Sequence, residues 1–411
     1  MLEELFPRAH SRYSSLPILG EVLEELCKWL HSRGYPGAAC RRRVAAAPML
    51  EQLLRNQHVR SLCDCTESNL TTSVPKPRKW TAHMAHALGR SLMLYLKDIG
   101  RLSLPLLTAS DRLVEAYCEY LKTVRGLAKA TVEKHATIAA EFLQFLEPDD
   151  RLQSLDDLHV TDIDAFLTKA GKRLGRASMQ KVAAVLRAFL DFLAAEERVP
   201  LGLAAHVDSP RRYRGERLPR ALPWKTVLTL LDSIDRSNPK GRRDYAMLLL
   251  IATYGLRRSE VATLDLDDIA WRAQQIRVSR SKVGTPLLLP LTDHVATSLM
   301  DYLRHGRPDT PHRRLFLRVR IPLGPIEATA VTDVFETWAA RAGIRLPSLG
   351  GPHCLRHSLA MHLLRQGKPL KTIGDLLGHR SVESTCVYLR LNVDDLRDVA
   401  LPLPAAQEGQ S

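Results

Sequence analysis

What the 411-residue sequence lacks already narrows the class of protein. No stretch approaches the roughly 18 consecutive apolar residues that a membrane-spanning helix needs, so we expect no membrane contact. The first residues, MLEELFPRAHSRYSS, lack the basic start and the apolar run that make a secretory signal. We therefore expect a protein that acts in the cytoplasm.

Cysteine is scarce as well. The chain has seven, and they are scattered: Cys27, Cys40, Cys63, Cys65, Cys118, Cys354 and Cys386. An odd and scattered set does not form a disulfide framework, and it fits a reducing compartment. Cys63 and Cys65 could begin a metal site, but a matching second pair is missing, so we expect free thiols and no metal.

The composition is that of a folded chain with an excess of positive charge. Hydrophobic residues make up 45% and charged residues 25%, which is ordinary for a globular protein, and the length suggests two or three domains. Lys and Arg number 59 against 45 Asp and Glu, which gives a net charge of +14. This excess favours an anionic partner, with nucleic acid as the leading candidate, although charge alone does not decide it.

Residues 1–105 form an N-terminal region whose role the sequence leaves open. Helices are expected around residues 21–30 and 84–96, and residues 66–79, rich in Ser, Thr, Pro and Lys, are expected to form a loop or linker. The run Arg41-Arg42-Arg43 could touch phosphate or belong to a solvated helix face. Binding to additional DNA and contact with another protein both remain open for this region.

The next segment, residues 106–208, is predicted to be a bundle of four short amphipathic helices. Thr131 and Thr161 are the expected caps of the second and third helices, and the fourth is expected near residues 178–197. Residues 209–221 follow as a basic linker with five Arg and two internal Pro. This linker could contact DNA or remain an ordinary solvated connection. The side chains proposed as DNA contacts are Arg211, Arg212, Arg214, Lys129 and Lys181.

A second helical domain is predicted over residues 222–400, and the tail at 401–411 is expected to be disordered. Its helices are expected near residues 226–234, 244–254, 331–342, 354–365 and 370–377, and from residue 381 onward. Residues 275–291 break the helical period, and alternation with a glycine turn predicts a β-hairpin there. The predicted fold is therefore mainly α, with a small β-hairpin or sheet in the second domain.

Several polar residues in this domain form a pattern suited to phosphate. Arg257 follows a buried helix and Gly255, and Ser259 is the expected cap of the helix after it. His353 and Arg356 lie three residues apart near the start of a helix, so they share one face. Two guanidinium groups and an imidazole would make a good phosphate clamp, because guanidinium forks match phosphate oxygens.

His379 and Tyr388 are separated by nine residues. One continuous helix would place them about 13.5 Å apart along its axis, so cooperation on one atom needs a break. Ser381 offers a cap for a new helix. Taken alone, Tyr388 is more typical of a half-buried core tyrosine than of a nucleophile, and His357 fits a structural histidine better than a metal ligand.

These segments resemble the motifs of the tyrosine recombinases, the phage integrase family. Thr253-Tyr-Gly-Leu-Arg257-Arg-Ser-Glu260 is similar to the first Arg box, and His353-Cys-Leu-Arg356-His357 to the His-x-x-Arg box. Leu376-Leu-Gly-His379 followed by Tyr388 resembles the last His and the nucleophile. Ser281-Lys282 resembles the Lys turn, although the basic neighbours usual in the family are missing. The resemblance covers residues 222–391, and more loosely residues 109–197, where the family has a core-binding helical domain of the SAM-like type.

The resemblance implies a role for each of these residues. Tyr388 would attack the scissile phosphate, forming a 3′-phosphotyrosyl bond and freeing a 5′-hydroxyl. Lys282 would protonate the leaving oxygen, and Glu260 would orient the site. The residues expected to hold the charge on the phosphate are Arg257, Arg356, His353 and His379. Neither ATP nor a metal or other cofactor would be needed, because the phosphotyrosine keeps the bond energy.

The expected function is therefore site-specific recombination or integration of double-stranded DNA, in the service of a mobile genetic element. The resemblance implies a homotetramer on paired DNA sites, a monomer or dimer otherwise, and accessory recombinases or directionality proteins as further partners. Residues 393–399 could pack on their own domain or dock into a neighbouring protomer. Two alternatives stay open: a catalytically silent DNA-binding relative, and an activity like that of type IB topoisomerases.

Overall fold

The computed structural model describes residues 1–71, 80–102, 108–146, 155–211, 220–279, 286–346, 351–378 and 383–389. Packing groups the chain into two units, one formed by Met1–Pro48 with Arg217–Ser411 and the other by Met49–Glu216. The described residues are mainly helical with one three-stranded sheet, which confirms the predicted fold class. Among them no helix is long and apolar enough to cross a membrane. The domain limits given above stay predictions.

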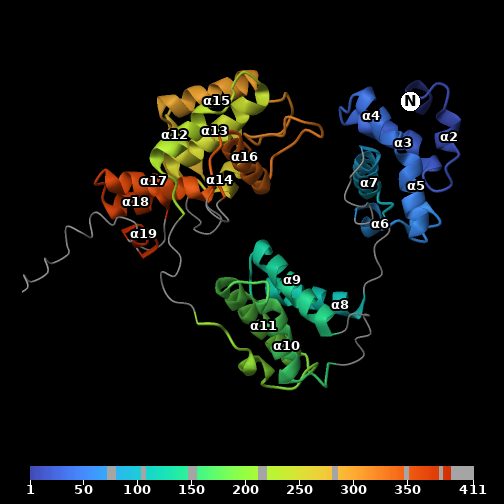
Figure 1. The fold of residues 1–411 in the computed structure, drawn as a ribbon, viewed down its shortest axis with the longest axis horizontal. Coiled ribbons are helices and arrows are strands. Elements are labelled where there is room, and N and C mark those ends of the chain that lie inside the picture. The colour runs from blue at the N-terminus through green and yellow to red at the C-terminus, as the bar shows by residue number, and fades with distance from the viewer. Residues whose placement is uncertain are drawn as a thin grey trace, which may run out of the picture. The chain divides into compact units, whose positions relative to one another are not determined.

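The four amphipathic helices predicted between residues 106 and 208 are present, and Figure 1 draws them in teal and green. They are α8 (Ala109–Thr123), α9 (Lys129–Leu146), α10 (Val160–Gly171) and α11 (Arg176–Ala195). Helix α8 packs along α9, and α11 packs on both α9 and α10. Their shared core is rich in aromatic side chains, among them Tyr117, Phe142 and Phe189, which are fully buried. These four helices are called the bundle below.

The starts of two bundle helices differ from the prediction. Thr131 lies in the first turn of α9, where its N–H already donates to the carbonyl of Ala128 at 2.7 Å. Thr161 lies inside α10, whose cap is His159. The carboxylate of Asp162 accepts the His159 N–H at 2.9 Å, so an acidic residue in the first turn marks this helix start.

The remaining helices before the bundle include the two that the sequence predicts, within α3 and α7. The helices are α1 (Leu2–Leu5), α2 (His10–Ser14), α3 (Gly20–Ser32), α4 (Gly37–Val44), α5 (Ala47–Asn56), α6 (Glu67–Thr71) and α7 (Trp80–Asp98). The prediction of a loop over residues 66–79 is wrong in its first part, because reciprocal hydrogen bonds between Thr66 and Asn69 start α6. Residues 72–79 lie outside the described residues. On α4, the Arg41 guanidinium lies over the Phe6 ring and that of Arg43 over Tyr35.

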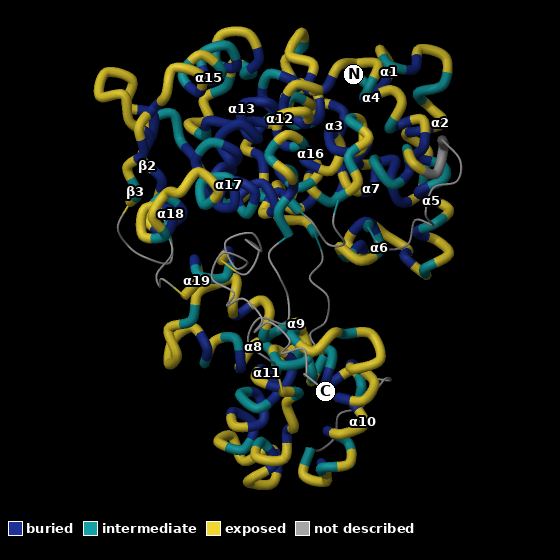
Figure 2. The backbone as a smooth tube through the Cα atoms, turned by 60° about the vertical axis from the view of Figure 1, so that its left-hand side comes forward, coloured by how far each residue is buried: buried dark blue, intermediate teal, exposed yellow. Residues whose placement is uncertain are grey.

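The C-terminal helices pack around one buried helix. They are α12 (Trp224–Asp232), α13 (Pro239–Tyr254), α14 (Arg258–Thr263), α15 (Asp293–His305), α16 (Ala328–Arg341), α17 (His353–Arg365), α18 (Leu370–Leu377) and α19 (Glu383–Cys386). Helix α13 contacts α12, α14, α15, α16 and α17, and Figure 2 shows it buried along most of its length. Its apolar surface runs almost all round, as the sequence predicts. Helix α15 was not predicted, whereas the predicted helix at 370–377 has the observed bounds.

The predicted β-hairpin is confirmed. Strands β1 (Ile269–Ala270), β2 (Gln275–Val278) and β3 (Leu287–Pro290) form an antiparallel sheet in that order. Ile276 pairs with Leu289 and Val278 with Leu287, and the alternating side chains Ile276, Val278 and Leu289 are buried. The tip of the hairpin, residues 280–285, lies outside the description.

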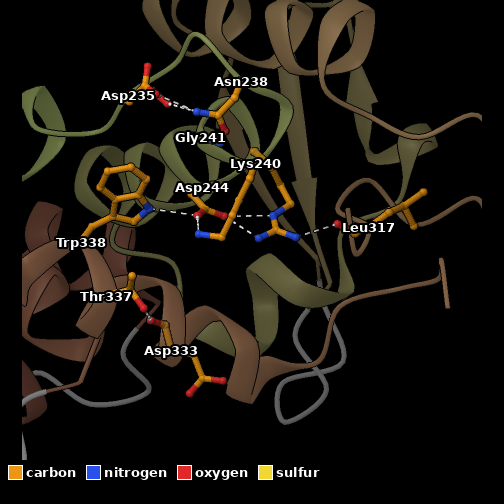
Figure 3. A network of polar contacts seen from close by, with 10 residues as sticks. Asp235, Asn238, Lys240, Gly241, Asp244, Leu317, Asp333, Thr337 and Trp338 are labelled. Atoms are coloured by element: carbon orange, nitrogen blue, oxygen red, sulfur yellow. Dashed lines mark hydrogen bonds and ion pairs between the residues drawn. The ribbon is translucent and has the colours of Figure 1, made fainter. Parts of the chain in front are cut away.

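A buried carboxylate ties α13 to α16. Asp244 accepts hydrogen bonds from Lys240 at 2.8 Å, from Arg243 at 2.6 Å and from the indole of Trp338 at 2.9 Å (Figure 3). Arg243 also donates to the carbonyl of Leu317 at 3.1 Å. Asp244 is fully buried, so these donors replace the water that the carboxylate loses. This network fixes the helix whose C-terminal end leads into the site.

Candidate active site

Arg257 lies at the start of α14, directly after the end of α13. Helix α13 ends at Gly255, whose φ of 65° is a left-handed conformation that glycine adopts most readily. The Arg257 backbone N–H donates to Glu260 Oε2 at 2.7 Å, and its guanidinium donates to Oε1 at 2.7 Å. The predicted cap Ser259 is therefore wrong, because the buried Glu260 carboxylate takes that role. The Arg257 side chain stays 41% exposed, so it can meet a ligand.

Arg356 is buried in the first turns of α17, with 1% of its surface exposed. Its guanidinium donates to the backbone carbonyls of Gly255 and Leu377, at the ends of α13 and α18. A Cβ on Gly255 would lie 2.4 Å from Leu377 Cδ2 and 3.4 Å from Arg356 Cγ. Glycine is thus needed for both its backbone angle and its lack of a side chain. These contacts hold a permanent cation beside the loop that carries Arg257.

His353 begins α17, one helical turn before Arg356. Part of the ring is accessible, but neighbouring protein atoms displace enough water to lower its pKa, and the charges of Arg356 and Arg257 lower it further. The Glu260 carboxylate acts in the opposite direction. The imidazole is therefore neutral near pH 7. His353, Arg356, Arg257 and Glu260 form one electrostatic cluster, as the two motif boxes predict.

Tyr388 follows the four-residue helix α19 and is 2% exposed. Its backbone N–H donates to the carbonyl of Thr385 at 3.0 Å, and Thr385 is buried against α18, where a Cβ on Gly374 would lie 3.0 Å from its Oγ1. The ring packs with Leu359, Ile373 and other apolar residues of α17 and α18, which lie next to α19 in Figure 1. In burial, this tyrosine resembles a core residue.

The Tyr388 hydroxyl nevertheless lies at a polar position. It is 2.9 Å from Nδ1 of His357, the residue after Arg356. Burial raises the pKa of the phenol, and the charge of Arg356 opposes this. The phenol is therefore protonated near neutral pH and lies within the electrostatic field of the buried arginine.

Three aromatic rings connect the phenol to the cationic cluster. The centroids of His353 and His357 are 4.6 Å apart with an edge-on angle of 83°, and those of His357 and Tyr388 are 5.6 Å apart. Both imidazoles lie on one face of α17 because they are four residues apart. Helix α17 therefore supplies His353, Arg356 and His357 together.

The structure leaves several predicted site residues without a test. Lys282, His379, Arg212 and Arg214 lie outside the described residues, as do Ser381, residues 393–399 and the tail. The three other proposed DNA contacts, Lys129 on α9, Lys181 on α11 and Arg211 after the bundle, are exposed. In the described parts of the chain, no group of three His, Cys, Asp or Glu side chains could hold a metal ion.

The sequence predicts His357 to be a structural histidine and does not predict its contact with Tyr388. The signal was present in the spacing, since His357 is four residues after His353 and one after Arg356. A residue next to Arg356 on a helix points about 100° away from it, which hid the contact.

Comparison with known proteins places these features in context. Residues 220–394 match the model of the phage integrase family, and residues 114–197 match that of the phage integrase N-terminal SAM-like domain. The putative integrase/recombinase y4rA of Sinorhizobium fredii is 35% identical over 385 residues, which are 92% of either chain. Tyrosine recombinase XerD of Mycobacterium tuberculosis is 36% identical over 214 residues, 50% of this chain and 67% of that protein.

Solved structures show the same fold at low identity. The XerH recombinase bound to palindromic difH substrate gives a TM-score of 0.54 at 18% identity, over 85% of this chain and 93% of that one. A lambda integrase dimer bound to a core site gives 0.53 at 19%, over 67% and 94%.

Proposed function

The chain belongs to the phage integrase family and is a tyrosine-type site-specific recombinase, and from this premise we propose that Tyr388 is its nucleophile. The observation that carries the proposal is the position of the Tyr388 hydroxyl. It lies 2.9 Å from a residue next to Arg356, whose charge acts on its pKa. An arginine charge also acts on the pKa of other buried tyrosines, as that of Arg125 does on Tyr117, but Arg356 differs because it is itself buried, with 1% of its surface exposed.

In the proposed reaction the partner is double-stranded DNA. Tyr388 Oη attacks the phosphorus of one strand, a P–Oη bond forms and the bond to the 5′-oxygen breaks. Arg257, Arg356 and His353 stabilise the negative charge on the nonbridging oxygens. A 5′-hydroxyl from a second DNA strand then attacks the phosphotyrosine and restores a phosphodiester, so the bond count is conserved.

Two further roles rest on the family motifs alone. Lys282, at the hairpin tip, is proposed to protonate the leaving 5′-oxygen, since a strand-connecting turn can reach into a neighbouring site. His379 is proposed to help hold the phosphate. Glu260 is proposed to act through Arg257, whose guanidinium it positions at 2.7 Å.

DNA binding has to uncover the site. Arg356 and Tyr388 are 1% and 2% exposed, whereas Arg257 is 41% exposed. Arg257 is therefore proposed to meet the phosphate first, and the net charge of +14 supplies attraction that does not depend on sequence. Lys129, Lys181 and the basic linker at residues 209–221 are proposed to contact the DNA backbone.

The wider setting is proposed from the family. The protein is proposed to assemble as a homotetramer on paired DNA sites and to work with accessory recombination proteins. It is also proposed to act in the cytoplasm and to serve a mobile genetic element.

Trapping the covalent intermediate tests the nucleophile. Protein expressed in cells that carry its own genetic element is purified under denaturing conditions, and the DNA that remains attached is sequenced. We expect one recurrent junction with wild-type protein and none with Tyr388→Phe, which should still bind a duplex of that junction.

The matched control is Tyr245→Phe, because Tyr245 is also buried and its hydroxyl lies 2.9 Å from Nε2 of His294. This variant should form the adduct. Adduct formation by Tyr388→Phe would refute the assignment. No adduct with wild type would favour a DNA-binding relative without activity, and plasmid relaxation without recombinants would favour topoisomerase activity.

A further inference from the structure

In the proposed reaction the phenolic proton of Tyr388 needs an acceptor. Burial raises the pKa of Tyr388, so the nucleophile enters the reaction as a neutral phenol. A phenol has to lose its proton as its oxygen bonds to phosphorus. Arg356 cannot receive that proton, because a guanidinium stays charged throughout the working pH range.

His357 is positioned to receive it. Its Nδ1 lies 2.9 Å from Tyr388 Oη, within the reach required of a general base. When the phenol is the donor, Nδ1 accepts and the neutral ring carries its proton on Nε2. The edge-on contact with His353 at 4.6 Å supports the ring orientation, which gives a nucleophile, a base and a third group in sequence.

We propose that His357 is a further catalytic residue, the general base that accepts the phenolic proton of Tyr388. The inference rests on the proposed role of Tyr388. As the P–Oη bond forms, the Oη–H proton passes to His357 Nδ1, and the electron pair of the breaking bond leaves with the 5′-oxygen. That oxygen takes its own proton from Lys282. On religation the attacking 5′-hydroxyl gives its proton to the neutral amine of Lys282, and the imidazolium returns its proton to the tyrosine oxygen, so both groups end in their starting states.

Two substitutions separate basicity from positioning. In His357→Asn the side-chain oxygen can occupy the place of Nδ1 and accept the hydrogen bond, but it cannot take a proton at neutral pH. His357→Ala removes both functions. The readout is the single-turnover rate of adduct formation on a nicked duplex of the trapped junction, with saturating protein.

We expect both variants to be slower than wild type by about 100-fold or more, since general base catalysis contributes about 10²–10⁴-fold. A His357→Asn variant within a few-fold of wild type would overturn the proposal. Acceleration in His357→Ala would also overturn it, because it would make His357 a restraint on the tyrosine. His135→Asn is the matched control, since His135 forms the same bond at 2.9 Å with Tyr117 of the bundle.

A modified substrate separates the base from the acid. When the bridging 5′-oxygen is replaced by sulfur, the leaving thiolate needs no proton. Lys282→Ala should then recover most of its rate, whereas His357→Asn should stay slow. Recovery of His357→Asn would contradict its assignment as the base.

The wild-type protein provides a test that needs neither variants nor DNA. Nitrogen NMR of labelled histidine should find His357 as the Nε2–H tautomer, and a proton on Nδ1 at neutral pH would refute the inference. The failures are distinguishable. Absence of adduct with wild type refutes the proposed function, whereas a wild-type adduct with an unslowed His357→Asn refutes only the role of His357.

Discussion

The bundle and the C-terminal part of the chain that carries the candidate site, called the catalytic region here (described residues between 220 and 389), each contain a buried Tyr–His pair, and the surroundings of the two pairs differ. Each has a tyrosine bonded to a histidine at 2.9 Å, Tyr117 with His135 and Tyr388 with His357. Tyr117 packs between Phe189 and other aromatic rings on long helices. Tyr388 follows a four-residue helix and lies in the field of a buried arginine.

The comparison shows that a buried Tyr–His pair does not by itself indicate a nucleophile. In the bundle, the pair satisfies a polar group inside an aromatic core. In the catalytic region, the pair adjoins Arg356 and, through His353, the loop that carries Arg257. The second set of surroundings makes a phenol useful for attack on a phosphate.

The largest expected effect comes from replacing Arg356, and Arg187 of the bundle is the matched control because it also donates to a backbone carbonyl. Arg356 donates to Gly255 and Leu377, and in the bundle Arg187 donates to Val207 through both Nε and Nη2. Arg356→Lys should reduce the rate of adduct formation by about 10²–10³-fold, the range found when one transition-state donor is removed. Arg187→Lys should leave that rate within a few-fold. Equal losses in the two variants would show that Arg356 acts through folding alone.

Alanine substitutions at Gly126 and Gly255 separate the cost of backbone strain from the cost of overpacking. Gly126 and Gly255 have φ of 57° and 65°, but a Cβ would meet nothing within 4 Å at Gly126 and would meet Leu377 at 2.4 Å at Gly255. Gly126→Ala should therefore cost only about 1–2 kcal/mol in free energy of unfolding, the cost of the left-handed conformation alone. Gly255→Ala should cost about 2–4 kcal/mol, because overpacking adds to the strain. Urea unfolding of each variant measures both values, and equal costs would contradict the described packing.

The smallest expected effect concerns pH. The pKa of His353 and that of His135 are both lowered, in each case first by loss of contact with water. Folding then disfavours protonation, so stability should be full above the unfolded pKa of about 6.5 and should fall as the pH drops below it. Replacing either histidine with Gln should reduce the loss of melting temperature between pH 7 and pH 5. An unchanged pH dependence in both variants would contradict this account.

The sequence predicted the fold best where periodicity is strong. The bundle helices, the buried α13 and the hairpin all followed from apolar spacing. Helix starts were less predictable, because acidic residues in the first turn compete with Ser and Thr as markers, as Asp162 and Glu260 show.

The candidate site was predictable as a set of residues and unpredictable as a set of contacts. The motif boxes predict Arg257, His353, Arg356 and Tyr388 as site residues, and in the structure the charges of both arginines act on His353. The bond between His357 and Tyr388 joins residues 31 positions apart, and it depends on how Thr385 packs against α18. Local spacing places His357 on the same helix face as His353, but it does not specify which distant residue His357 contacts.

The most direct test of the central claim is to locate the covalent bond. The trapped protein–DNA complex is digested with nuclease and protease, and the peptide that carries the residual nucleotide is sequenced by mass spectrometry. The account predicts a phosphodiester on Tyr388 and on no other residue. A nucleotide attached to Tyr245, Tyr254 or a serine, with Tyr388 unmodified, would contradict it.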